Sequence, residues 1–168
     1  MNEAIKILWV DDEIDLLKPH ILFLEEKGYS VYTAYNADDA MEMVKEKLFH
    51  TILLDEQMPG INGLEALSQI KNIAPSTPVI MITKSEEENI MEEAIGAKID
   101  DYLIKPVNPK QILLSIKKNI ETNKLVSEKA ISNYQSEFQY ISRLIDEAVH
   151  YNDWKNIYKR LIYWELTL

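Results

Sequence analysis

Five short apolar runs alternate with stretches of helical periodicity over residues 1–121, and this alternation restricts the fold more than any other feature. The runs have the length and composition of buried strands, and each is followed by apolar side chains at helical spacing. Strands that alternate with helices predict a parallel sheet with right-handed crossovers and helices on both faces. We therefore expect an α/β fold with a five-stranded, doubly wound sheet. The predicted strands are residues 5–10, 30–35, 51–54, 79–83 and 101–104.

Capping signals mark several of the predicted helices. Asn36 precedes the second helical pattern as an N-cap residue, and the third pattern begins at Asn62. Ser85, with Glu88 three residues later, forms a capping box for the fourth helix, which we expect to end at Gly96.

Residues 122–168 differ from the rest of the chain, because they show helical periodicity only. Their apolar and aromatic side chains form two stripes, which we interpret as the core of a helical bundle and not as a cofactor site. The second stripe still continues at Leu168, so we expect this segment to be cut before a further domain. We predict a first domain at residues 1–121 and a helical linker or bundle segment at 122–168.

Charge and composition exclude several function classes. The formal net charge at pH 7 is −10, and residues 122–168 hold six basic and six acidic side chains, so the excess lies in residues 1–121. This disfavours nucleic acid as a direct ligand. Without cysteine the chain has no disulfide and no thiolate metal site, and any metal would take oxygen ligands. No apolar run could span a membrane and no signal-peptide pattern opens the chain, so we expect a cytoplasmic protein.

Polar residues follow the predicted strands where chemistry is expected. Asp11 and Asp12 follow the first run, Asp55 the third, Thr83 ends the fourth and Lys105 follows the fifth. The carboxyl ends of parallel strands meet at one edge of a sheet, so we expect these side chains to lie together. Three close carboxylates either shift their pKa values or recruit a cation, and oxygen ligands suit Mg²⁺.

This group favours phosphoryl chemistry. Mg²⁺ would neutralise the oxygens of a phosphoryl group, Thr83 and Lys105 would contact the remaining ones, and Asp55 would attack the phosphorus. Taken alone, an acid after a strand is more simply a loop cap, and only its neighbours favour the functional interpretation.

The order and spacing of five motifs resemble the receiver domain of two-component response regulators. The matching stretches are Val10–Glu13, Leu54–Asp55, Met58–Pro59 with Gly63, Ile82–Thr83 and Tyr102–Pro106. The resemblance implies a CheY-like (flavodoxin-like) fold in which Asp55 is the phosphoacceptor. It also implies that a sensor histidine kinase or a small phosphodonor supplies the phosphoryl group.

The same resemblance implies a metal site and a switch. The implied Mg²⁺ ligands are Asp12, Asp55, the backbone carbonyl of Gln57 and, partly through water, Asp11. Lys105 would pair with the phosphoryl group, and the peptide bond before Pro106 would be cis. Thr83 and Tyr102 would couple phosphorylation to a surface change. By itself, Tyr102 would be an ordinary half-buried strand residue.

The face expected to respond consists of the helix after Ser85, the strand at Tyr102 and the helix after Asn108. For this face the resemblance implies homodimerisation on phosphorylation. The sequence departs from the common pattern at two places. Lys84 stands where the family has a small residue, and it would line the mouth of the site or, equally, be a solvated helix-start residue. Glu56 and Gln57 add larger polar groups to the loop after Asp55, where the family tunes the lifetime of the phosphoryl group.

Longer stretches resemble the PorX group of response regulators, which serves type IX secretion. They are residues 7–20, 82–88, 102–109 and 163–166. In that group a receiver is followed by a helical bundle and a PglZ effector domain of the alkaline phosphatase superfamily. This chain would carry the first two parts and none of the effector's catalytic residues. A sigma factor or a secretion-system component would be further partners, and Lys84 fits the group.

Two other function classes stay open beside the phosphorylation-controlled switch. A DNA-binding transcriptional response regulator needs a basic recognition helix, which the neutral segment 122–168 lacks. A Mg²⁺-dependent phosphatase needs a second acid two residues after its nucleophile, and here that residue is Gln57. We therefore expect a protein that is not an enzyme and that loses its phosphoryl group slowly.

Overall fold

The computed structural model describes residues 4–84, 96, 99–151, 159 and 162. The chain divides into two compact units, Met1–Asn123 and Lys124–Leu168. The helix expected after Ser85 and the second apolar stripe of the tail lie outside the described residues.

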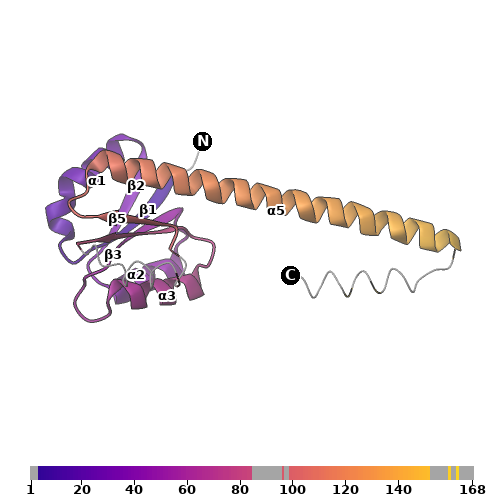
Figure 1. Ribbon diagram of the computed structural model, residues 1–168, viewed down its shortest axis with the longest axis horizontal. Helices are drawn as coiled ribbons and strands as arrows, with labels where there is room; N and C mark the ends of the chain where they lie inside the picture. Colours follow the sequence, from indigo (N-terminus) through magenta and orange to yellow (C-terminus); the bar gives the residue numbers. More distant parts are fainter. Residues whose placement is uncertain (1–3, 85–95, 97–98, 152–158, 160–161, 163–168) are drawn as a thin grey trace. The chain divides into compact units, whose positions relative to one another are not determined.

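One five-stranded sheet organises the first unit, with the strand order β2-β1-β3-β4-β5 (Figure 1). All of its strand pairs are parallel, which confirms the predicted fold class. The chain order reverses between β1 and β3, and in such sheets ligands bind outside the carboxyl ends of the strands at this point. The strands are β1 (Ile5–Val10), β2 (Tyr29–Ala34), β3 (Thr51–Asp55), β4 (Val79–Thr83) and β5 (Asp101–Ile104).

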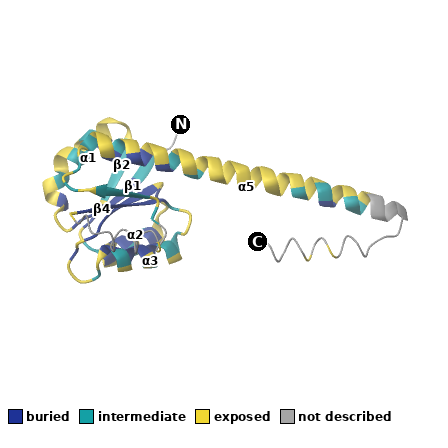
Figure 2. Cartoon of the chain, viewed as in Figure 1, coloured by how far each residue is buried: buried dark blue, intermediate teal, exposed yellow. Residues whose placement is uncertain are grey.

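Helices cover both faces of the sheet. One face packs against α2 (Ala37–Glu46) and α3 (Gly63–Ile73), and the other against α1 (Lys18–Glu26) and the first turns of α5 (Pro109–Tyr151). Successive side chains of a strand point to opposite faces, so each central strand contributes to both cores. Figure 2 shows the burial concentrated in the sheet and in the helix faces that cover it.

Trp9 illustrates this double-sided burial. It lies in the core shared with α1 and α5, whereas its neighbours Leu8 and Val10 lie in the core shared with α2 and α3. All three side chains are fully buried. The end of β1, where Asp11 follows, is therefore held from both faces of the sheet.

Two helix boundaries differ from the prediction. The first helical pattern begins with a 3₁₀ turn at Ile14–Leu17, and the α-helix starts only at Lys18. Pro19 lies in the first turn of α1, where its missing N–H leaves no helical hydrogen bond unmade. The fifth helix and the first stripe of the tail, predicted as separate elements, form the single helix α5. No glycine or proline interrupts the chain after Pro109 in this helix.

The loop that follows β3 is closed by the start of α3. The backbone N–H of Gly63 donates to the carbonyl of Glu56 at 2.8 Å, and Asn62 is the N-cap residue. The Asn62 side-chain oxygen accepts a hydrogen bond from the backbone N–H of Glu65 at 2.9 Å. This cap satisfies one of the N–H groups that the first turn of a helix leaves without an intrahelical partner.

We expect Asn62→Ala to lower the free energy of unfolding by about 1 kcal/mol, because the N–H of Glu65 loses its acceptor. Asn62→Ser keeps a capping oxygen and should stay within a few tenths of a kcal/mol of the parent protein. Chemical denaturation of the three proteins measures the difference. Equal losses in both variants would show that the cap does not stabilise α3.

No helix in the described part of the chain is long and apolar enough to cross a membrane.

Candidate functional site

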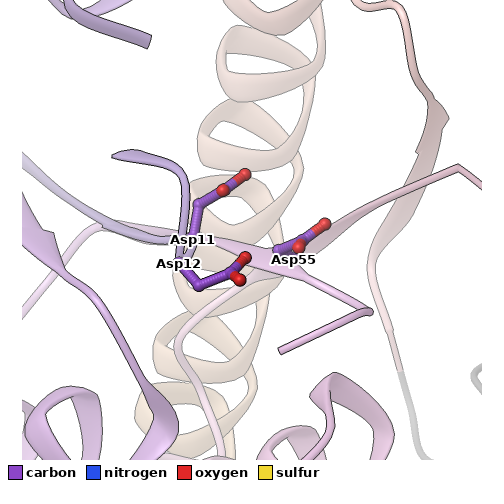
Figure 3. A group of neighbouring side chains, drawn as sticks. All are labelled: Asp11, Asp12 and Asp55. Atoms are coloured by element: carbon purple, nitrogen blue, oxygen red, sulfur yellow. The ribbon is translucent and has the colours of Figure 1, made fainter. Parts of the chain in front are cut away.

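Three acidic side chains meet at the carboxyl edge of the sheet, as predicted (Figure 3). Asp11 and Asp12 follow β1, and Asp55 is the last residue of β3. Carboxyl oxygens of the three residues lie within 4.8 Å of one another. Asp11 is buried and Asp55 is only 3% exposed, whereas Asp12 is exposed. The edge therefore presents a cluster of oxygen ligands that is open to solvent on the side of Asp12.

Lys105 supplies the positive charge within this cluster. Its Nζ lies 2.9 Å from Asp11 Oδ2 and 2.9 Å from Asp55 Oδ1, and its side chain is 17% exposed. Burial by itself lowers the pKa of this ammonium group, but the two carboxyl groups outweigh that effect and raise the pKa. Lys105 therefore stays charged beside Asp55.

Lys105 does not fully offset the effects that disfavour the charged form of Asp55. Burial raises its pKa to about 6, Lys105 acts in the opposite direction, and the charges of Asp11 and Asp12 raise the pKa further. Its Oδ1 is an oxygen acceptor 2.9 Å from Lys105 Nζ, and this contact does not offset the effect of burial on the pKa. Such an acceptor among three carboxyl groups suits a hard divalent cation.

Asp11 and Gln57, two of the other implied metal ligands, differ in their contacts and exposure. Both carboxyl oxygens of Asp11 are already engaged, since Oδ2 accepts from Lys105 and Oδ1 accepts from the backbone N–H of Glu13 at 2.9 Å. Gln57 is exposed on the loop after β3. The contacts given for the described residues do not include the backbone carbonyl of Gln57, so its role as a metal ligand stays a prediction.

Thr83 lies at the end of β4 and is fully buried. Its hydroxyl donates to Glu56 Oε2 at 3.1 Å, and it also forms a hydrogen bond with the hydroxyl of Tyr102. Glu56, predicted to be a group at the mouth of the site, is 9% exposed and engages Thr83. The sequence contains no signal for this contact, because Glu56 follows β3 whereas Thr83 ends β4, and the two residues meet only in the folded sheet.

Lys84 lies on the surface beside the site. Its Nζ pairs with Glu13 Oε2 at 3.1 Å, and both side chains are at least half exposed. Exposed ion pairs of this kind contribute about 0 to 1 kcal/mol to the free energy of unfolding. Lys84 and Glu13 line a mainly apolar cavity of about 450 Å³ that also reaches Asp11 and Lys105. The Lys105-Pro106 peptide bond is cis, as the resemblance implied.

Comparison with known proteins identifies the family. A model of the response regulator receiver domain matches residues 7–117. The chain belongs to this family. A second model, of the PorX response regulator linker domain, matches residues 124–168.

Individual relatives agree with this assignment. The chain is 38% identical over 116 residues to the transcriptional regulatory protein ResD of Bacillus subtilis, an alignment that covers 69% of this chain and 48% of ResD. Among solved structures, a CheY-like receiver domain of Methanospirillum hungatei is 29% identical with a TM-score of 0.70, covering 73% of this chain and 98% of that one. The BeF₃-activated receiver domain of DrrB is 32% identical with a TM-score of 0.64, covering 71% and 99%. The chain thus spans about half the length of ResD and nearly all of each receiver domain.

Membership in the receiver family carries several general properties. Receiver domains take part in two-component signalling with a histidine kinase as partner, and they bind Mg²⁺ at an acidic pocket. In this chain Asp11, Asp12 and Asp55 form an acidic cluster. Receiver domains are generally not enzymes, and neither family match adds an enzymatic effector domain to the chain.

Proposed function

We propose that this chain is a phosphorylation-activated switch in which Asp55 accepts a phosphoryl group from a sensor histidine kinase or a small phosphodonor. The observation that carries this proposal is the placement of a buried, poorly compensated carboxyl group 2.9 Å from the ammonium group of Lys105. A carboxylate oxygen of Asp55 would form the new bond to phosphorus while the bond between phosphorus and the donor atom breaks. Lys105 would then pair with the oxygens of the transferred group.

Mg²⁺ would be held by Asp12, Asp55 and the backbone carbonyl of Gln57, with Asp11 acting through water. The engaged oxygens of Asp11 support its indirect role, since each already accepts a hydrogen bond from a neighbour. When bound, the ion supplies positive charge for the phosphoryl oxygens. Lys105 alone leaves the three carboxyl groups undercompensated.

The switch would run through Thr83 and Tyr102, which already share a hydrogen bond. A shift of the Thr83 hydroxyl toward the phosphoryl group would change the position of Tyr102 and so the surface formed by β5 and the start of α5. We propose that this surface then forms a homodimer. Slow loss of the phosphoryl group goes with the proposal, because Gln57 cannot act as a general acid.

The role beyond the receiver rests on residues 124–168, which match the linker domain of PorX. This match supports a regulator of type IX secretion with an effector domain that follows the linker, and with a sigma factor or secretion component as a candidate partner. The alternative is a transcriptional response regulator that binds DNA, which the name of ResD, a transcriptional regulatory protein, suggests. The equal numbers of acidic and basic residues in 122–168 favour the first role.

Incubation with acetyl phosphate and Mg²⁺ tests the proposal. We expect the intact mass to rise by one phosphoryl group and light scattering to show a dimer, whereas Asp55→Asn should show neither change. Asp38→Asn, at an exposed site in the first turn of α2, serves as the matched control and should behave as the parent protein does. An equal mass gain in Asp55→Asn, or none in the parent protein, would refute Asp55 as the acceptor. A mass gain without a change in size would refute only the dimer.

A further inference from the structure

Glu56 and Thr83 form a buried hydrogen bond at the edge of the phosphorylation site. Glu56 directly follows Asp55, and its Oε2 accepts the Thr83 hydroxyl at 3.1 Å. The backbone holds both residues in place, because the N–H of Glu56 donates to the carbonyl of Ile82 at 3.1 Å and thereby extends the pairing of β3 with β4. The contact is thus built into the sheet and is not a chance meeting of two surface side chains.

The hydroxyl of Thr83 can serve only one acceptor at a time. A threonine hydroxyl carries a single proton and two acceptor lone pairs. Here the proton goes to Glu56, and the hydrogen bond with Tyr102 is satisfied when the tyrosine donates to a lone pair of Thr83. The three side chains then form one chain of hydrogen bonds, from Tyr102 through Thr83 to Glu56. In this arrangement Thr83 has no proton left for a phosphoryl oxygen on Asp55.

We infer that Glu56 is a positioning residue that restrains Thr83 in the unphosphorylated protein and so opposes activation. Phosphorylation must draw the Thr83 proton away from Glu56, and a buried carboxyl oxygen then loses its donor. The strength of this one hydrogen bond therefore helps to set the balance between the inactive and active states. The inference rests on the proposed phosphorylation of Asp55, and it adds a residue that acts on the switch without contacting the phosphoryl group.

The test compares the affinity of the metal-loaded protein for beryllofluoride, a phosphoryl analogue, among variants at Glu56. Glu56→Met has similar length but no acceptor, and we expect it to bind beryllofluoride about tenfold more tightly, as loss of a hydrogen bond of this type predicts. Glu56→Gln loses the charge but keeps an acceptor oxygen, so its affinity should stay within about threefold of the parent protein. Comparison of Glu56→Met with Glu56→Gln separates the effect of the hydrogen bond on the affinity from the effect of the Glu56 charge.

A second comparison asks whether the effect passes through Thr83. Thr83→Val removes the hydroxyl while keeping the shape, and in this background Glu56→Met should no longer change the affinity. A persisting gain in the Thr83→Val background, or equal gains in Glu56→Met and Glu56→Gln, would overturn the inference. If Glu56→Met does not fold, Glu56→Leu takes its place.

The same titrations distinguish a failure of the role of Glu56 from a failure of the proposed phosphorylation of Asp55, on which that role rests. Failure of the parent protein to bind beryllofluoride in the presence of Mg²⁺ would contradict the phosphorylation of Asp55 itself. Normal binding by the parent protein with unchanged binding by Glu56→Met would contradict only the role of Glu56. Binding is followed by the chemical shift of the Thr83 backbone amide in NMR titrations, which needs no enzymatic readout.

Discussion

Gly63→Ala should lower the free energy of unfolding by about 3 kcal/mol, at the upper end of the usual range for overpacking. A Cβ atom built on Gly63 would collide with the carbonyl oxygen of Asp55 and would lie 2.6 Å from the Cα atom of Glu56. These are backbone atoms, so no side-chain rotation relieves the collision. The loop after β3 or the start of α3 has to move instead. Thermal or chemical denaturation measures the loss.

The same substitution should impair the site as well as the fold, because the colliding atoms belong to Asp55 and to the residue after it. We expect slower phosphorylation by acetyl phosphate even under conditions where the variant is fully folded. Ser68→Ala introduces the same methyl side chain at an exposed position of α3 and is the matched control, with an expected change within about 0.5 kcal/mol. A Gly63→Ala variant as stable and as reactive as Ser68→Ala would contradict the close approach of α3 to the Asp55 loop.

Asp55→Asn should stabilise the metal-free protein at neutral pH, by about 3 kcal/mol. Burial raises the Asp55 pKa from 3.8 to about 6, with Lys105 opposing the shift and the nearby carboxylates adding to it. Between these two values the folded protein holds a proton that the unfolded chain has released. The parent protein therefore loses stability as the pH rises through this window, and an uncharged amide avoids the loss.

The pH dependence provides the sharpest check of this prediction. The stability difference between Asp55→Asn and the parent protein should be small near pH 4, grow up to about pH 6 and stay constant above it. Denaturation curves in the presence of a chelator measure the difference at each pH. Addition of Mg²⁺ should stabilise the parent protein more than the variant and so narrow the gap. Asp38→Asn, on the surface, should show no comparable trend, and a loss of stability in Asp55→Asn at about pH 8 would contradict the raised pKa.

Local patterns along the chain were sufficient for the fold class and for the edge of the sheet at which Asp11, Asp55 and Lys105 gather. The strand ends could be located because apolar runs stop at polar residues, and all strands of a parallel sheet point their carboxyl ends the same way. Asp11, Asp55 and Lys105 could therefore be assigned to one edge before any contact was known. The structure confirms that they meet there.

The prediction did not resolve two other features. The single helix α5 replaced two predicted elements, because helical periodicity continues through Thr122 without a residue that breaks the backbone. On sequence grounds Lys84 could be a site-mouth residue or a solvated one; its exposed ion pair with Glu13 lies at the lining of the cavity that reaches Asp11 and Lys105.

Glu56 shows most clearly the difference between what the sequence predicts and what only the tertiary structure decides. An acidic residue after a strand is expected at the surface, since an isolated buried carboxyl group is unfavourable. Its burial becomes acceptable only because the pairing of β3 with β4 brings the hydroxyl of Thr83, 27 residues later, within 3.1 Å. Periodicity reports which residues form strands and where those strands end. Which polar side chains satisfy one another across neighbouring strands is decided by the packing of the sheet, since hydrogen bonds act over a few ångströms in space and not along the chain.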